Sequence, residues 1–283
     1  MSVWLPSAPC TPGTCVEPTG SATAVPRAVL RLAAVVALVL AGVVLLPFGG
    51  RIPAELVRRW CRWIVRAAGV RVRVTGTAAP TGGTLLVANH ISWLDIPLLG
   101  AVRPARMVAK AEIRRWPVAG ALAARGGVLF IDRDRLRGLP DTVDHIARAL
   151  RAGQAVGVFP EGSTWCGRAQ GTFRRAAFQA ALDARVPVQP VRLRYRLDGG
   201  TASGARLGGT APAHRTSTAP AFVGEDSLLA SVWRVVSARG LVAEVEIREA
   251  IPYGSHPDRR SLARAAQPGA TVQPGWIHSA VVT

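Results

Sequence analysis

The stretch "TLLVANHISWLD" (residues 84–95) places a histidine and an aspartate directly after a continuous apolar run. An apolar run without polar alternation is typical of a strand that is buried on both faces of a sheet. His90 and Asp95 are five residues apart, so on one continuous helix they would lie on different faces. We therefore predict that His90 lies in a turn, that a helix begins near residues 93–97, and that Asp95 folds back onto the imidazole.

The rest of the middle of the chain alternates between strand and helix patterns. Apolar runs predict further strands at residues 70–76, 105–110, 127–132, 155–160, 186–195 and 242–249. Helix patterns lie between them at residues 140–153, 173–184 and 226–239. This alternation predicts the α/β class, with a mostly parallel or mixed central sheet flanked by helices.

The front of the chain has a different composition. Residues 1–26 are rich in Pro, Thr, Ser and Ala without periodicity, which predicts a disordered leader. Residues 32–48 carry no charge, and at ~1.5 Å per residue the wider stretch 29–48 would reach ~30 Å, about one hydrocarbon thickness. We predict an N-terminal membrane helix. A cleaved signal peptide fits less well, because the run is long and far from the N-terminus; a buried helix of a soluble protein is the remaining alternative.

Residues 51–70 carry apolar side chains at helical spacing on one face, while Arg58, Arg62 and Arg66 recur every fourth residue elsewhere. This pattern predicts an amphipathic interfacial helix. We interpret residues 27–69 as a membrane anchor with an interfacial helix. A spanning anchor and a helical hairpin in one leaflet both fit the pattern.

The chain is strongly basic, with 35 Lys and Arg against 17 Asp and Glu. The excess predicts an anionic partner, which charge alone leaves open among nucleic acid, an anionic membrane surface and phosphate-bearing substrates. Lys110 is the single lysine in an arginine-rich chain, and we keep it as a candidate site residue. The four cysteines show neither CxxC pairing nor zinc-like spacing with histidines, so we expect a reduced, cytosol-facing protein without a metal site.

Chemically distinct polar residues follow several of the predicted strands. His90, Lys110, Arg133 and Glu161 each come immediately after an apolar run. In α/β folds the site gathers at the strand ends, where the loops face a common crevice. We expect these four residues to belong to one site.

Four blocks of sequence carry a resemblance to a known family. "NHISWLD" (89–95) resembles the first motif of the glycerolipid acyltransferases, typified by 1-acylglycerol-3-phosphate acyltransferases. "GGVLFIDR" (126–133), "FPEGST" (159–164) and "VPVQPV" (186–191) are similar to the next three motifs, in the family's order, and "KAEI" (110–113) and "FRRAAF" (173–178) resemble flanking segments. The resemblance spans roughly residues 70–195. Ser163 stands where the family usually has threonine, which affects acceptor preference rather than catalysis.

The resemblance implies acyl transfer without a cofactor. His90 would act as general base on a free hydroxyl of the acceptor, Asp95 would orient it, and the acceptor oxygen would attack an acyl thioester, either acyl-CoA or acyl-ACP. Arg133 and Glu161 would belong to the acceptor site. The full set of predicted substrate-binding residues is Lys110, Arg133, Glu161, Gly162, Ser163, Thr164, Arg174 and Arg175. We place the last two in the first turn of their helix, where free N–H groups favour an anion.

We accordingly divide the chain into a leader (1–26), an anchor (27–69), an acyltransferase domain (70–253, with a long loop at 199–221) and a disordered tail (254–283). The predicted location is the cell membrane, with the site on the cytoplasmic face. The predicted partners are membrane lipids, the acyl donor and a phosphate-bearing lyso-lipid, with no nucleic acid. Lysophosphatidic acid is the default acceptor; lyso-ornithine lipid, another lysophospholipid and glycerol 3-phosphate stay open.

Other classes of protein are open to test. GxSxG, the serine hydrolase signature, does not occur in the sequence. A metal-dependent phosphoesterase would use His90, Asp95 and Glu161 as ligands. A non-enzymatic basic protein that binds a membrane surface or nucleic acid fits the charge, but it gives no reason for the ordered motifs.

Overall fold

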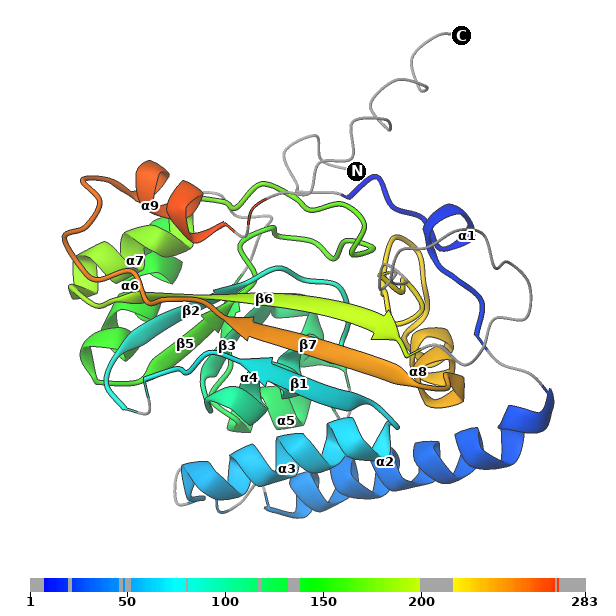
Figure 1. The fold of residues 1–283 in the computed structure, drawn as a ribbon. Helices are drawn as coiled ribbons and strands as arrows, with labels where there is room; N and C mark the ends of the chain where they lie inside the picture. Colours follow the sequence, from blue (N-terminus) through cyan, green and yellow to red (C-terminus); the bar gives the residue numbers. More distant parts are fainter. Residues whose placement is uncertain are drawn as a thin grey trace, which may run out of the picture.

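A seven-stranded mixed sheet forms the centre of the protein in the computed structural model (Figure 1). The structure describes residues 8–19, 22–45, 48, 52–79, 81–116, 119–131, 138–198, 216–267 and 269. The strands are β1 (Arg71–Thr75), β2 (Thr84–Ala88), β3 (Arg106–Lys110), β4 (Leu129–Ile131), β5 (Ala155–Val158), β6 (Val188–Leu197) and β7 (Leu241–Ile247). All seven predicted strands are present, which confirms the predicted α/β class.

Strand β2 lies in the middle of the sheet, whose order is β1-β7-β6-β2-β5-β3-β4. It pairs in parallel with β5 on one side and β6 on the other, and β5, β3 and β4 continue in parallel. Strand β7 is antiparallel to β6, and β1 is parallel to β7. All five residues of β2 are buried, which explains its unbroken apolar run. Its carboxyl end therefore delivers His90 beside the end of β5.

Helices cover both faces of the sheet. Their bounds are α1 (Pro12–Cys15), α2 (Val25–Leu45), α3 (Ala54–Ala67), α4 (Asp95–Val102), α5 (Ala119–Arg125), α6 (Leu139–Arg151), α7 (Ala176–Ala184), α8 (Leu228–Ser237) and α9 (Arg259–Ala266), with 3-10 turns η1 (Ala22–Ala24) and η3 (Ala111–Arg115). One buried cluster joins α3, α4 and α8 to the sheet, and a second joins α6, α7 and α9 to it. Within β2, Leu85 and Val87 belong to the second cluster and Ala88 to the first, so side chains alternate between the two cores.

Helices α2 and α3 lie side by side along one edge of the domain (Figure 1). Trp60 of α3 donates its indole N–H to the carbonyl of Leu38 at 2.9 Å, and its ring packs where Gly42 leaves room. At the other end of α2, Arg31 donates to the carbonyls of Val236 and Ala238 beside α8. Helix α2 is long and apolar enough to cross a membrane, with a mean hydropathy of 2.7 over its best window, of which 11% is buried.

The structure differs from the predicted disorder at the front of the chain. Residues 8–19 pack on the domain, where the Glu17 N–H donates to the Thr218 hydroxyl and the Thr19 hydroxyl donates to the Arg234 carbonyl. These partners lie 201 and 215 residues away along the chain, so local composition carries no sign of them. Residues 1–7 and 20–21 of the predicted leader lie outside the described residues.

The predicted loop and tail also contain ordered structure. Helix α9 lies within residues 254–283, with the Asp258 side chain capping the N–H groups of Arg260 and Ser261 at 2.7 and 2.8 Å. Its residues Leu262 and Ala263 are buried in the core that α6 and α7 share. Residues 217–221 of the predicted loop are buried as well, whereas residues 199–215 lie outside the described residues.

Candidate active site

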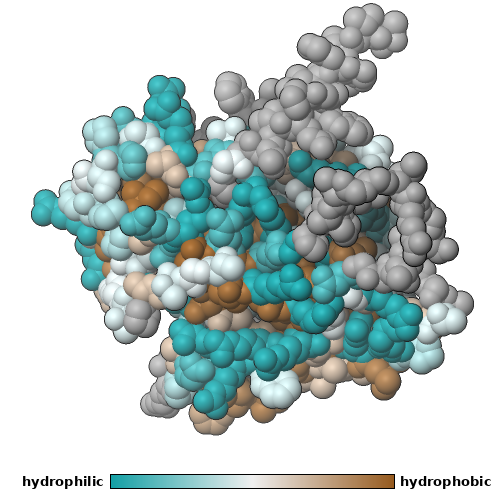
Figure 2. All heavy atoms as spheres, viewed as in Figure 1, coloured by the Kyte–Doolittle hydropathy of each residue, from teal (hydrophilic) through white to brown (hydrophobic). Residues whose placement is uncertain are grey.

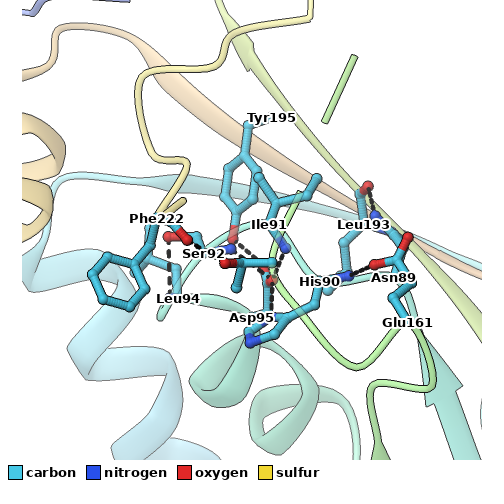
Figure 3. Close-up of polar contacts among 11 residues, drawn as sticks. Asn89, His90, Ile91, Ser92, Leu94, Asp95, Glu161, Leu193, Tyr195 and Phe222 are labelled. Atoms are coloured by element: carbon cyan, nitrogen blue, oxygen red, sulfur yellow. Dashed lines mark hydrogen bonds and ion pairs between the residues drawn. The ribbon is translucent and has the colours of Figure 1, made fainter. Parts of the chain in front are cut away.

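His90 and Asp95 meet at the carboxyl end of β2. The imidazole Nδ1 lies 2.8 Å from Asp95 Oδ2, which confirms the contact predicted from their spacing (Figure 3). Helix α4 begins at Asp95 itself, so the histidine lies in the turn that precedes the helix, as predicted. The turn reverses the chain between the strand and the helix and brings the two side chains face to face.

The carboxylate of Asp95 is fully buried and is surrounded by donors (Figure 3). Besides the imidazole, its Oδ2 accepts the backbone N–H groups of Ile91 at 2.6 Å and Ser92 at 2.8 Å. Its Oδ1 accepts the phenolic O–H of Tyr195 at 2.6 Å. Four donors thus satisfy an acidic group that has no access to water, and the turn is wound around it.

The contact with Asp95 fixes the tautomer of His90. A carboxylate only accepts hydrogen bonds, so Nδ1 carries the ring proton and Nε2 keeps its lone pair. The ring stacks on Phe159, with centroids 4.0 Å apart and planes 10° from parallel, which holds its orientation. The His90 side chain is 21% exposed, so the ring is reachable by a substrate. A neutral imidazole held in this way can take a proton from a hydroxyl group.

Tyr195, on β6, is a site residue that was not predicted from the sequence. Its side chain is fully buried, and burial together with the charge of Asp95 raises its pKa, so that it stays a donor to the carboxylate. The available signal was its position in "VRLRYRL" (191–197), where it alternates with arginines and shares the inward face with Val191 and Leu193. A tyrosine on an inward face needs a buried partner for its hydroxyl.

Asn89 is a second residue whose role was not predicted from the sequence. Its side-chain amide donates to the carbonyl of Leu193 at 3.0 Å and accepts the N–H of the same residue at 2.8 Å. The amide thereby continues the pairing of β2 with β6 for one residue beyond the strand. This anchors the start of the turn that carries His90.

Glu161 follows β5 and reaches the backbone of the same turn. Its Oε2 accepts the His90 N–H at 2.7 Å and its Oε1 accepts the Gly171 N–H at 3.0 Å. Burial raises the pKa of Glu161 to about 8, against the lowering effect of these two hydrogen bonds. Glu161 is 3% exposed as a whole residue, so the contribution that this geometry supports is to hold His90 against the loop after β5.

The loop after Glu161 holds His90 from a second direction. The backbone N–H of Trp165 donates to the His90 carbonyl at 2.8 Å, and the Thr164 hydroxyl donates to the carbonyl of Phe222. The Ser163 hydroxyl is buried and has no hydrogen-bond partner among the described residues. The loop therefore positions the histidine through its backbone, and the Ser163 hydroxyl lies two residues before that backbone contact.

The basic residues that were predicted to bind substrate and that the structure describes lie away from the His90–Asp95 pair. Lys110 is exposed at the end of β3, two strands away from β2 in the sheet. Arg174 and Arg175 are exposed, and they precede α7, which begins at Ala176, so their predicted place in its first turn is wrong. The predicted site residue Arg133 lies outside the described residues.

The metal-ligand alternative for His90, Asp95 and Glu161 does not fit these contacts. The Nδ1 of the imidazole faces one carboxylate. Both carboxylates already accept backbone N–H groups. Oxygen atoms that accept these hydrogen bonds are turned toward protein donors rather than toward a shared cation.

Comparisons with known proteins match a region that contains His90, Asp95 and Glu161. The model of the family described as Acyltransferase matches residues 71–194. A lyso-ornithine lipid O-acyltransferase of Pseudomonas aeruginosa is 39% identical over 216 residues, which are 75% of this chain and 76% of that protein. A 1-acyl-sn-glycerol-3-phosphate acyltransferase of Neisseria meningitidis is 32% identical over 203 residues, 71% and 73% of the two chains. The crystal structure of the 1-acyl-sn-glycerophosphate acyltransferase from Thermotoga maritima aligns with a TM-score of 0.49 and 19% identity, over 83% of this chain and 92% of that one.

Replacement of Tyr195 by phenylalanine tests its positioning role. The change removes one hydrogen bond to a buried carboxylate, which contributes about 1.5–3 kcal/mol, so we expect kcat to fall about tenfold or more with little change in KM. Tyr253→Phe is the matched control, since Tyr253 is half exposed. Equal kcat and KM values for the two variants would remove Tyr195 from the site.

Replacement of Glu161 by glutamine tests the consequence of its raised pKa. Between the ordinary pKa of 4.5 and about 8 the folded chain holds a proton that the unfolded chain has lost. The free energy of unfolding of the wild type should therefore fall as pH rises through this range, by at most about 1.4 kcal/mol per pH unit. Denaturant unfolding at several pH values should show this fall in the wild type and in the exposed control Glu249→Gln. Glu161→Gln should lack it, and parallel curves for all three proteins would contradict the assignment.

Proposed function

The chain belongs to the acyltransferase family of lyso-lipid enzymes, and on this premise we propose that it moves a fatty acyl group from an acyl thioester to the free hydroxyl of a lyso-lipid. The observation that carries the proposal is the His90 imidazole whose Nδ1 is bound by buried Asp95 at 2.8 Å. That contact leaves Nε2 as the proton acceptor of a side chain that is 21% exposed.

In the proposed reaction His90 acts as general base. Nε2 takes the proton of the acceptor hydroxyl while its oxygen attacks the thioester carbonyl carbon. A C–O bond forms, the C–S bond breaks, and the leaving thiolate takes the proton back from the imidazolium. Asp95 stabilises the imidazolium, and positioned base catalysis of this kind contributes about 10²–10⁴-fold. The reaction needs no cofactor.

The cations predicted from the sequence have a role in this proposal. Lys110, Arg174 and Arg175 are exposed around the carboxyl end of the sheet and would bind anionic groups of the two substrates. Arg133 would bind the acceptor phosphate in two hydrogen bonds, as the guanidinium geometry allows. The free hydroxyl of Ser163 would bind a polar group of the acceptor.

The first candidate for the acceptor is lysophosphatidic acid, and acyl-CoA or acyl-ACP is the donor. A lyso-ornithine lipid is the second candidate, because a relative named for that acceptor is 39% identical to this chain, against 32% for the relative named for 1-acyl-sn-glycerol-3-phosphate. Both acceptors present a free hydroxyl to the same base, so the chemistry at His90 is the same.

We further propose that α2 and α3 lie in one leaflet of a membrane, with the site on the cytoplasmic face. The chain before α2 packs on the domain through residues 8–19, and the chain after it returns to the same domain through α3. Both ends of α2 therefore belong on one side of the bilayer. Val29, Leu30, Leu40 and Val44 expose between 50% and 72% of their surface, and apolar atoms line the lower edge in Figure 2, where α2 lies in Figure 1.

Replacement of His90 by alanine tests the reaction. We expect at least about a 10²-fold loss of acyl transfer, because the base is removed. Binding to lipid vesicles should be unchanged, since α2 and α3 are untouched. His145→Ala, on the exposed face of α6, is the control and should keep full turnover. Near-normal turnover by His90→Ala would defeat the proposal.

A substrate panel decides between the acceptors. Purified full-length protein is assayed with lysophosphatidic acid, lyso-ornithine lipid, another lysophospholipid and glycerol 3-phosphate, each with acyl-CoA and with acyl-ACP. We expect the highest kcat/KM with lysophosphatidic acid. A higher value with lyso-ornithine lipid would select the second candidate, and transfer to glycerol 3-phosphate alone would reject a lyso-lipid acceptor.

A further inference from the structure

Three cysteine thiols from distant parts of the chain meet beside the active-site loop. Cys10 and Cys15 belong to the N-terminal segment, and Cys166 follows Trp165 in the loop after β5. Their Sγ atoms all lie within 4.8 Å of one another. Cys10 and Cys166 are 5% and 4% exposed, and Cys15 is half-buried. The fourth cysteine, Cys61, lies apart from them in α3, against Gly100.

The arrangement of the three sulfur atoms suits a thiophilic cation. Sulfur ligands lie about 2.3 Å from a metal such as zinc, so three of them around one ion form a triangle with edges of roughly 4 Å. The three thiols need to move together by less than about 1 Å to reach that spacing. The group contains only sulfur donors, which select soft ions such as Zn²⁺ and Cu⁺ over Mg²⁺ or Ca²⁺.

Hydrogen-bond donors surround the sulfur of Cys166. They are the Cys10 thiol and the backbone N–H groups of Arg168 and Ala169. Gly167 has a φ of +87°, and this left-handed turn lets the following N–H groups point back at the sulfur. Cys10 and Cys166 are buried, so sulfurs that bound here as thiolates would need a cation to balance their charge.

We propose that Cys10, Cys15 and Cys166 form a three-thiolate site for a thiophilic d¹⁰ cation, Zn²⁺ or Cu⁺. On binding, each thiol releases its proton to solvent and its sulfur donates an electron pair to the ion, so no oxidant or reductant is needed. Three sulfurs complete a trigonal shell for Cu⁺, and a water molecule completes a tetrahedral shell for Zn²⁺. The proposal replaces the expectation of no metal site, which was based on spacing along the chain.

The site would fasten the N-terminal segment to the loop that holds His90. Trp165, next to Cys166, donates its backbone N–H to the His90 carbonyl at 2.8 Å. Glu17 reinforces the same contact through an ion pair with Arg168 at 2.6 Å. A bound ion at Cys166 would therefore restrain the backbone one residue away from a contact with the candidate base. The metal site does not depend on the acyl-transfer proposal.

Metal content and cobalt binding test the site. The full chain is purified without chelator under anaerobic, reducing conditions, and its zinc and copper are measured by elemental analysis. We expect about one ion per chain, and the element found identifies the ion. The metal-free chain should bind one Co²⁺ with thiolate-to-cobalt charge-transfer absorption, and its thermal unfolding midpoint should rise by several degrees with added Zn²⁺. Cys10→Ser and Cys166→Ser should lose at least nine-tenths of the bound metal, whereas Cys61→Ser should keep it.

Two results would overturn the proposal. In the first, the wild-type chain with four free thiols binds no stoichiometric Zn²⁺, Cu⁺ or Co²⁺. In the second, non-reducing mass spectrometry of the anaerobically purified chain shows two of the three cysteines joined as a disulfide. The cobalt titration uses the wild-type chain, so the test holds even if a serine variant fails to fold.

Discussion

A carboxylate that is withdrawn from water must be met by hydrogen-bond donors, and at Asp95 this requirement organises the site. The donors come from the turn after β2, from the imidazole of His90 and from Tyr195 on β6. Each donor is held by a central element of the sheet or by the turn that leaves it. The orientation of the imidazole therefore follows from the packing of the core and not from a mobile surface loop.

Much of this architecture could be predicted from the sequence, because buried parallel strands leave unbroken apolar runs and the five-residue spacing of His90 and Asp95 excludes a shared helix face. The spacing did not reveal Tyr195, which lies 100 residues from Asp95 along the chain. The apolar run at residues 155–160 placed Glu161 at a strand end. It did not show that the Glu161 carboxyl group turns inward to the His90 N–H. Residue type and strand ends predict where polar groups gather, whereas the directions of side chains depend on long-range packing.

The two ends of the chain also show that contacts between distant residues could not be predicted from local composition. Composition without periodicity predicted disorder for residues 1–26, yet residues 8–19 are held by specific long-range contacts such as the Glu17–Arg168 ion pair. Those contacts also bear on α2, whose hydropathy fits a spanning helix or a one-leaflet hairpin equally well. Both ends of α2 are tied to one domain, and the proposed one-leaflet arrangement is based on these contacts. The cysteines follow the same rule, since Cys166 lies 151 residues beyond Cys15 in the sequence and beside it in the fold.

The most direct measurement of the central interaction is the protonation state of the His90 ring in the folded chain. Selective ¹⁵N labelling of histidine, with His90→Gln to assign the resonances, reports which ring nitrogen carries the proton at neutral pH. The account predicts a proton on Nδ1 and a free lone pair on Nε2, and loss of this preference in Asp95→Ala. A proton on Nε2, or the same spectrum in the two proteins, would contradict it.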